Sequence, residues 1–196
     1  MANYCTVEQI KNAINLTTTA NDAVILGVIE RTSRMIDDYF CYPPNYFLPG
    51  SSPDDDELKY FDGTDGDMLW LDDLLVVLSE IKFVFTNETL ASADYFSYPY
   101  NKFPIQAIKL NPDGAYSKWP NRERSISIFG LWGVTATLPP PIEQATIIQA
   151  VRIFREGQQA FQDGARTDVG KLVYVKGLHP NVVEILSNIP VYNQVI

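Results

Sequence analysis

The chain has 196 residues, enough for one domain with a substantial core or for two small ones. Its 24 acidic and 15 basic side chains give a net charge of −9 and a pI near 4.5, which argues against a free nucleic-acid binder or a binder of anionic membranes. Mean hydropathy is −0.08 and no apolar run approaches the ~18 residues that cross a bilayer, so we expect no membrane partner.

Cysteine and histidine are scarce, which restricts the chemistry available. Cys5 and Cys41 fit neither a CxxC motif nor a Cys/His metal spacing, so we expect two buried thiols, no metal site and no cofactor. The single histidine, His179, leaves little machinery for activating a nucleophile, so we expect no catalytic residues and no enzyme activity. Residues 1–9 lack the basic and apolar regions of a secretory signal, so we expect synthesis in the cytoplasm.

The first elements in chain order are helices. A short one begins after Thr6, because Thr6 and Gln9 have the spacing of a capping box. A longer one is predicted over about residues 20–40, and Pro43 and Pro44 end it. Its apolar stripe consists of Ile25, Val28, Ile29, Thr32, Met35, Ile36 and Tyr39.

A β-rich region follows, from about residue 42 to residue 139. Pro, Gly, Asn, Asp and Tyr become more frequent there, and short runs typical of strands replace the helical period. We predict strands near residues 58–61, 68–71, 76–86, 95–98, 105–110 and 125–134.

Helices return in the last third of the chain. Pro141 is a good first-turn residue for a helix whose apolar positions continue to Phe161, and Asp163-Gly164 ends it. A last short helix is predicted after His179, which we interpret as a capping or surface residue.

The order of the elements predicts an α+β fold. We expect residues 1–41 and 140–196 to form a small helical bundle and residues 42–139 to be an inserted antiparallel β region, in one functional unit.

Residues 54–73 carry nearly the whole net charge. They contain nine carboxylates and one cation, Lys59, for a net charge of −8. We interpret this stretch as a solvated, turn-rich loop. A calcium site stays open as an alternative, although the stretch lacks the late glutamate of an EF-hand. So does a carboxylate pair of a glycoside hydrolase, whose separation the sequence does not reveal.

Aromatic side chains cluster twice, at residues 39–47 and at residues 95–103. Without flanking lysine and arginine, they make a poor platform for single-stranded nucleic acid. We therefore expect them to pack in the core or at interfaces. The run Gly130-Leu131-Trp132-Gly133 has no phosphate-loop lysine and is predicted to be a closely packed strand.

Several segments resemble the head–tail connector proteins of tailed phages, also called adaptor or head-completion proteins. The resemblance covers most of the chain, and its motifs are structural ones. They are Thr6-Val7-Glu8-Gln9-Ile10-Lys11, Ile36-Asp37-Asp38-Tyr39-Phe40, Tyr60-Phe61-Asp62-Gly63, Leu69–Leu75, Ile126–Gly133, Glu143-Gln144-Ala145 and Gly177–Leu186.

The resemblance implies a structural virion protein at the head–tail interface. Such a protein would form a ring of about twelve copies beneath the portal protein and above a tail-side connector or stopper protein. Genomic DNA would pass through the centre without specific binding, which suits an acidic chain.

Two sets of residues are candidate sites within this hypothesis. The first, in an arm over residues 163–176, is a portal or subunit interface made of Arg166, Lys171, Tyr174 and Lys176. The second is an acidic surface or channel loop made of Asp54, Asp55, Asp56, Asp62, Asp65 and Asp67. The alternative function is a carbohydrate-binding or other tail-associated binding module, suggested by the aromatic clusters and the aspartates.

Overall fold

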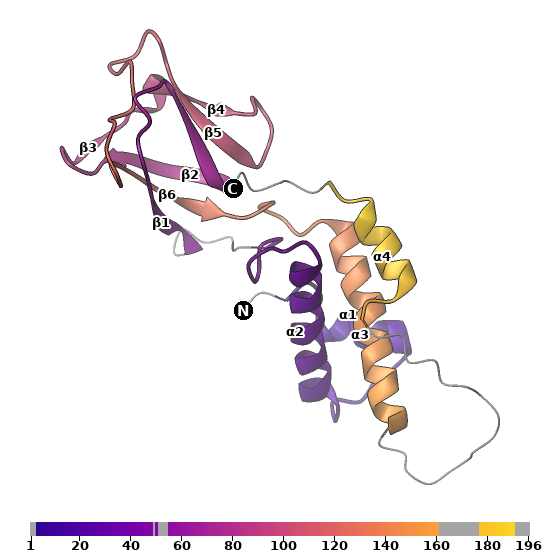
Figure 1. The fold of residues 1–196 in the computed structure, drawn as a ribbon. Coiled ribbons are helices and arrows are strands. Elements are labelled where there is room, and N and C mark those ends of the chain that lie inside the picture. The colour runs from indigo at the N-terminus through magenta and orange to yellow at the C-terminus, as the bar shows by residue number, and fades with distance from the viewer. Residues whose placement is uncertain (1–2, 49, 51–54, 161–176, 191–196) are drawn as a thin grey trace. The chain divides into compact units, whose positions relative to one another are not determined.

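The computed structural model describes residues 3–48, 50, 55–160 and 177–190. The chain divides into two compact units. The helical unit consists of Met1–Asn45 and Leu138–Val191, and the sheet unit spans Tyr46–Thr137. Figure 1 shows the helices and strands of each unit in chain order. Of the described helices, none combines the length and the apolarity that crossing a bilayer requires.

The helical unit begins with α1 (Val7–Ile14) and α2 (Asp22–Tyr39). The predicted capping box of α1 is confirmed: the Gln9 backbone N–H donates to Thr6 Oγ1, and the Thr6 backbone N–H donates to Gln9 Oε1. Asn15, in the left-handed conformation, ends α1. The predicted stripe of α2 is buried along its length at Ile25, Ile29 and Ile36.

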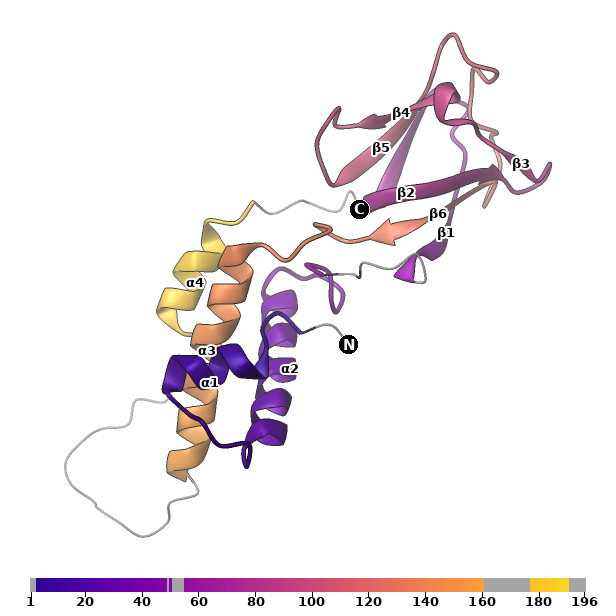
Figure 2. The same cartoon turned by 180° about the vertical axis from the view of Figure 1, so that it is seen from behind.

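The unit is completed by α3 (Pro140–Ala160) and α4 (Pro180–Ser187). α3 contacts each of the other helices, and α1 also contacts α2. Figure 2 shows α1 running across the two longer helices. The shared core of α1, α2 and α3 consists of Cys5, Ile10, Ile25, Ile29, Ala150 and Phe154.

The two cysteines differ in their exposure. Cys5 lies in the helical core, as predicted, and burial raises the pKa of its thiol to about 12. Cys41 is exposed, so the prediction of a buried thiol is wrong there. It follows the last turn of α2 with a φ of 57°, and its backbone N–H donates to Asp38 O. Cys41 thus lies in the chain reversal after the helix and not on its apolar stripe.

The sheet unit is a six-stranded antiparallel sheet, so the predicted α+β class is confirmed. The hydrogen-bonded order is β1-β6-β2-β5-β4, and the short β3 also pairs with β2. The strands are β1 (Glu57–Phe61), β2 (Met68–Phe83), β3 (Glu88–Thr89), β4 (Tyr95–Tyr98), β5 (Ile105–Leu110) and β6 (Ile126–Trp132), with a 3₁₀ turn, η2 (Ser92–Asp94), before β4.

β2 corrects one prediction from the sequence. The sequence predicts two strands, at residues 68–71 and 76–86, but residues 68–83 form one strand of 16 residues, and residues 84–86 lie in the turn after it. Its first half pairs with β5 and its second half with β6, and the register shifts between Trp70 and Leu75 and twice more before Glu80. These irregularities let the strand continue through Asp72 and Asp73, where its alternation is interrupted.

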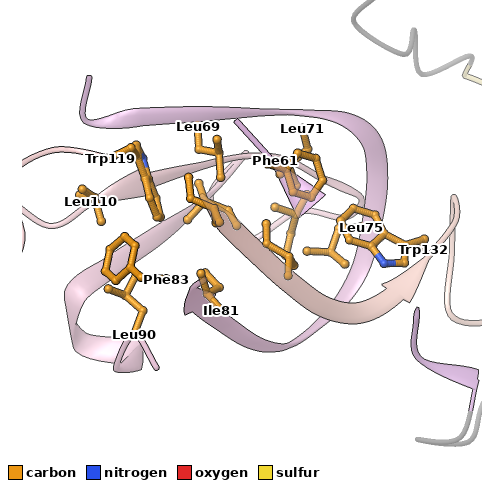
Figure 3. Packing of buried hydrophobic residues seen from close by; sticks show 14 residues of the cluster. Phe61, Leu69, Leu71, Leu75, Ile81, Phe83, Leu90, Leu110, Trp119 and Trp132 are labelled. Atoms are coloured by element: carbon orange, nitrogen blue, oxygen red, sulfur yellow. The ribbon is translucent and has the colours of Figure 1, made fainter. Parts of the chain in front are cut away.

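The core of the sheet unit gathers side chains from β1, β2, β5 and β6 and from the connections between strands (Figure 3). Its members are Phe61, Leu69, Leu71, Leu75, Ile81, Phe83, Leu90, Ile105, Ile108, Leu110, Trp119, Ile126, Ile128 and Trp132.

Gly130 confirms the predicted close packing of β6. A Cβ atom at this position would lie 2.2 Å from the carbonyl oxygen of Val77 and 2.9 Å from Leu75 Cδ1. Gly130 faces Leu78 across the ladder, between two register shifts of β2. A glycine therefore allows the two strand backbones to approach where β2 bulges.

Candidate functional site

The acid-rich stretch does not form a single loop. Glu57 begins β1, and Asp72 and Asp73 lie within β2, so the loop interpretation is wrong at these positions. Asp62, Asp65 and Asp67 lie in the β1–β2 connection. Asp55 and Asp56 directly precede β1. Asp54 lies outside the described residues.

The β1–β2 connection is tied to the β5–β6 connection by its aspartates. The Arg124 backbone N–H donates to Asp62 Oδ1 at 2.6 Å, and Lys118 Nζ lies 3.5 Å from Asp65 Oδ1. The Trp119 indole N–H donates to the backbone carbonyl of Asp67 at 3.1 Å. A Cβ atom on Gly63 would lie 1.6 Å from Pro120 O, so the two connections are in close contact. The Asp62 carboxylate and the Asp67 backbone carbonyl therefore help to hold the two connections together.

The arrangement gives little support to metal or glycosidase chemistry. Among the residues that the structure describes, no group of three or more His, Cys, Asp or Glu side chains is placed to hold a metal ion. Asp62 pairs with a backbone N–H, whereas Asp65 and Asp67 pair with Lys118 and Lys109. Each of these three carboxylates thus has a donor or cation as its partner, not a second carboxylate.

The candidate interface residues Arg166, Lys171, Tyr174 and Lys176 all lie outside the described residues. The arm over residues 163–176 that they belong to therefore stays a sequence-based prediction.

A buried polar cluster around Asp37 lies at the C-terminal end of α2. The Asp37 carboxylate accepts hydrogen bonds from the Tyr4 hydroxyl and, at 3.1 Å, from the Asn45 backbone N–H. Arg34 Nη1 lies 3.2 Å from its Oδ2. Burial raises the pKa of Asp37 to about 6, against the opposing effects of the Tyr4 hydrogen bond and the Arg34 charge. One carboxylate thus holds the N-terminal segment, α2 and the residues that follow α2 together.

A second polar cluster lies in the sheet unit, around Lys59 of β1. The Lys59 ammonium pairs with Asp73, which also accepts a hydrogen bond from the Tyr46 hydroxyl. Lys59 Nζ lies 4.7 Å from the centroid of the Trp132 ring. Burial lowers the pKa of Lys59, although the charges of Glu57 and Asp72 oppose this shift. The cluster links β1, β2 and the end of β6.

His179 caps α4, as the sequence predicts. Its Nδ1 accepts the Asn181 backbone N–H at 3.2 Å. The His179 backbone N–H donates to the buried side chain of Gln149 at 2.9 Å. The contacts of the only histidine in the chain therefore indicate a structural role.

The second aromatic cluster is divided between the core and the surface: Tyr95 packs against the core of the sheet unit, whereas Phe96, Tyr100 and Phe103 are exposed. Core packing, one of the two expectations for this cluster, is therefore wrong for these three residues, and packing at an interface stays a prediction. Trp70 is 59% exposed, Tyr100 52% and Phe103 64%. Trp70 of β2 and Tyr98 of β4 both face Ala107 of β5, so their side chains lie on one face of the sheet. We call Trp70, Phe96, Tyr98, Tyr100 and Phe103 the aromatic patch. β4 has aromatic side chains on both faces of the sheet, so the sequence does not show which of them are buried and which are exposed.

The first aromatic cluster behaves as predicted at four of its five members. Phe40, Tyr42, Tyr46 and Phe47 are buried, whereas Tyr39 is exposed. The buried four follow the end of α2 directly.

A hollow of about 450 Å³ lies on the outer face of the strands at the other edge of the sheet. Its walls include the exposed side chains of Leu58 and Tyr60, and Arg124 stacks over Tyr60 at 4.6 Å from the ring centroid. The register of Leu58 with Phe129 and of Tyr60 with Ser127 places all four on one face. We call this feature the sheet-face hollow, lined by Leu58, Tyr60, Glu80, Lys82, Val84, Asn87, Ser127 and Phe129.

No family model matches this chain. No curated protein matches its sequence.

Solved structures with the same fold come from gene transfer agent (GTA) particles. One is described as the virion of a native GTA particle, and its chain is 16% identical over 95% of this chain and 89% of its own, with a TM-score of 0.54. A chain from the neck of a native particle, computed with C12 symmetry, is 15% identical over 92% and 85%, with a TM-score of 0.53. A chain from the neck of an empty particle, computed with C6 symmetry, is 15% identical over 92% and 86%, with a TM-score of 0.52. At this identity the likeness shows a shared fold.

Proposed function

We propose that this chain is a structural neck protein of a tailed, phage-like particle, and specifically the adaptor that joins head to tail. The observation that carries the proposal is the fold shared with chains of GTA neck structures along nearly the whole length of both partners. A match of this extent includes helices at both ends of the chain and the strands between them. In this proposal the helices form the bundle of a ring subunit, and the antiparallel strands form its insertion.

The proposed ring contains twelve copies, in keeping with the C12 symmetry of one matching neck structure. It would lie beneath the portal protein, contact a tail-side connector or stopper protein, and surround the path of the genomic DNA. The net charge of −9 supports passage without specific binding, because an acidic wall repels phosphate. The role is structural and not enzymatic, and it places the protein in the virion after synthesis in the host cytoplasm.

The proposed portal contact uses the cations of the arm, Arg166, Lys171 and Lys176, together with Tyr174. Binding of the full-length chain to purified portal rings of the same particle tests this directly. We expect binding by the unaltered chain and loss of binding when Arg166, Lys171 and Lys176 are all changed to Glu, because charge pairing would be reversed.

The matched control reverses three exposed cations elsewhere, Arg31, Lys102 and Arg155. It should bind as the unaltered chain does. Failure of the unaltered chain to bind portal rings would contradict the adaptor role. Equal binding by the two triple variants would contradict only the role given to the arm.

A second candidate function is a carbohydrate-binding module, and the aromatic patch is the observation that favours it. Exposed aromatic faces such as those of Trp70 and Tyr100 offer large apolar contact areas at little cost in side-chain entropy. A glycan array probed with the full chain separates the two functions. Specific binding that Trp70→Ala removes would support the module, and a silent array would reject it.

A further inference from the structure

The sheet unit has two edge strands, β1 and β4, and they differ in how they are protected against pairing with a further strand. β1 carries the charged side chains of Glu57 and Lys59, and the Glu57 carbonyl oxygen already accepts the Trp132 indole N–H at 2.9 Å. Charged side chains, lysine above all, are a common means by which an edge strand avoids further pairing. The edge at β1 is therefore protected.

β4, at the other end of the strand order, lacks this protection (Figure 1). Its sequence, Tyr95-Phe96-Ser97-Tyr98, contains no charge and no proline, and in the described part of the chain only β5 pairs with it. Asp94, the acidic residue before it, is engaged elsewhere, because its side chain accepts the Ala115 backbone N–H at 2.9 Å. One row of backbone N–H and C=O groups along β4 thus has no partner strand among the described residues.

The side chains of β4 offer apolar contacts on both faces of the sheet. Tyr95 packs against the core of the sheet unit, whereas Phe96 belongs to the aromatic patch and is 39% exposed. Tyr100 covers the same face, since its ring centroid lies 4.2 Å from that of Tyr98 and 6.2 Å from that of Phe96. A strand added beside β4 would gain main-chain hydrogen bonds and would cover apolar groups on both faces.

We infer that residues 191–196, which lie outside the described residues, add to this edge as a further strand. Their sequence, Val-Tyr-Asn-Gln-Val-Ile, is rich in the β-branched and aromatic residues that favour strands. Because side chains alternate along a strand, Val191 and Val195 would lie on one face, and Tyr192 and Ile196 on the other. This segment has neither a charge nor a proline, so it matches the uncharged edge of β4 and its apolar groups on both faces.

Another strand-like run outside the described residues, Lys171–Lys176, fits this edge less well. It has a lysine at each end, and both would need carboxylates near β4. Two acidic residues at the Tyr95 end of β4 already have partners: Asp94 accepts the Ala115 N–H, and Asp67 lies 3.3 Å from Lys109 Nζ. The uncharged segment requires no such partner.

Photo-cross-linking of the full chain tests this inference. The photoreactive phenylalanine analogue p-benzoylphenylalanine replaces Tyr192, and mass spectrometry locates the cross-linked residues. We expect cross-links that end in residues 95–100. The same probe at Tyr39, an exposed aromatic residue of α2, is the matched control and should give none there. Cross-links from residue 192 to β1 or to the helices, or a yield at residues 95–100 no higher than that of the Tyr39 probe, would overturn the inference.

A third probe position separates the two undescribed segments. With the analogue at Tyr174, we expect no enrichment of cross-links to residues 95–100. Cross-links from residue 174 to β4, with none from residue 192, would assign the edge to Lys171–Lys176 and would overturn the inference.

Hydrogen exchange measures the backbone pairing itself. Gln194→Pro removes an N–H that a paired strand needs, whereas Gln194→Ala keeps it. We expect the amides of β4 that do not donate to β5 to exchange about tenfold faster in Gln194→Pro than in Gln194→Ala. The amides of β1 should exchange equally in the two variants. Equal exchange along β4 in both variants would overturn the inference.

This inference and the proposed function fail separately. A chain that is present in particle necks but gives none of these cross-links would overturn only the strand addition. A chain that cross-links as expected but is absent from particles would keep the added strand while the neck function fails.

Discussion

At the scale of single residues, the raised pKa of Asp37 predicts how the stability of the protein changes with pH. Its pKa is raised from 3.8 to about 6 in the folded protein, so the folded state holds a proton that the unfolded state has released. Its contribution to stability is therefore complete below about pH 4 and is lost as the pH rises through about 6. Each tenfold change in proton affinity corresponds to about 1.4 kcal/mol. A pKa raised from 3.8 to about 6 therefore lowers the free energy of unfolding by at most about 3 kcal/mol at high pH.

Replacing Asp37 by Asn should remove this pH dependence. We expect the stability of the unaltered chain, relative to Asp37→Asn, to fall between about pH 4 and about pH 7. Urea unfolding followed by far-ultraviolet circular dichroism measures it, because the helices dominate that signal. Asp38→Asn, at an exposed position of the same turn, is the control. A constant difference between Asp37→Asn and the unaltered chain across this range would contradict the assignment.

Gly130 makes a second prediction at this scale. Gly130→Ala places a methyl group against the Val77 carbonyl, so one strand backbone must move. We expect a loss of about 1–3 kcal/mol in the stability of the sheet unit, as for other overpacked sites. The three tryptophans all lie in this unit, so tryptophan fluorescence during urea unfolding follows it. Gly66→Ala, which meets no atom closer than 3.4 Å, should be much milder; equal losses would refute the packing argument.

Capping residues were the most predictable individual residues. Thr6, Gln9 and His179 act through hydrogen bonds to backbone groups within three residues, so local sequence defines their role. Cys41 and the aromatic patch were not predictable in this way. Their exposure depends on which way the chain turns after α2 and on which face of the sheet the core covers.

At the scale of elements, the entry of α4 depends on one side chain of α3. Gln149 accepts the His179 backbone N–H at 2.9 Å, and its amide group lies 3.4 Å from the carbonyl of Gly177. Gln149→Leu leaves that part-buried N–H without its acceptor, and we expect a cost of about 1 kcal/mol. Hydrogen exchange of α4, followed by mass spectrometry, should speed up. Gln158→Leu, at an exposed position of α3, should leave it unchanged; identical exchange in both variants would contradict this link.

The strands show where sequence patterns succeed and where they fail. The predicted ranges of β4 and β5 coincide with those of the structure, because clear turns bound both. The pattern divides β2 in two, because the bulges around Asp72 and Asp73 interrupt its alternation. That residues 68–83 form one strand becomes clear only from the structure, in which they pair with β5 and then with β6.

At the scale of the whole molecule, the order of the elements predicted the α+β class but not the surfaces. The aromatic patch and the sheet-face hollow each combine side chains from several strands, so neither can be predicted from any one segment of the sequence. The sequence-predicted acidic residues, in contrast, are divided between loop packing and strands. Candidate assembly surfaces therefore emerged from the fold.

The central claim is that this chain is a neck component, and copy number tests it most directly. Quantitative mass spectrometry of purified particles would count this chain against the major capsid protein. The account predicts about twelve copies in each particle, as one ring beneath a portal requires. Absence from the particle, or a copy number far from that of one ring, would contradict it.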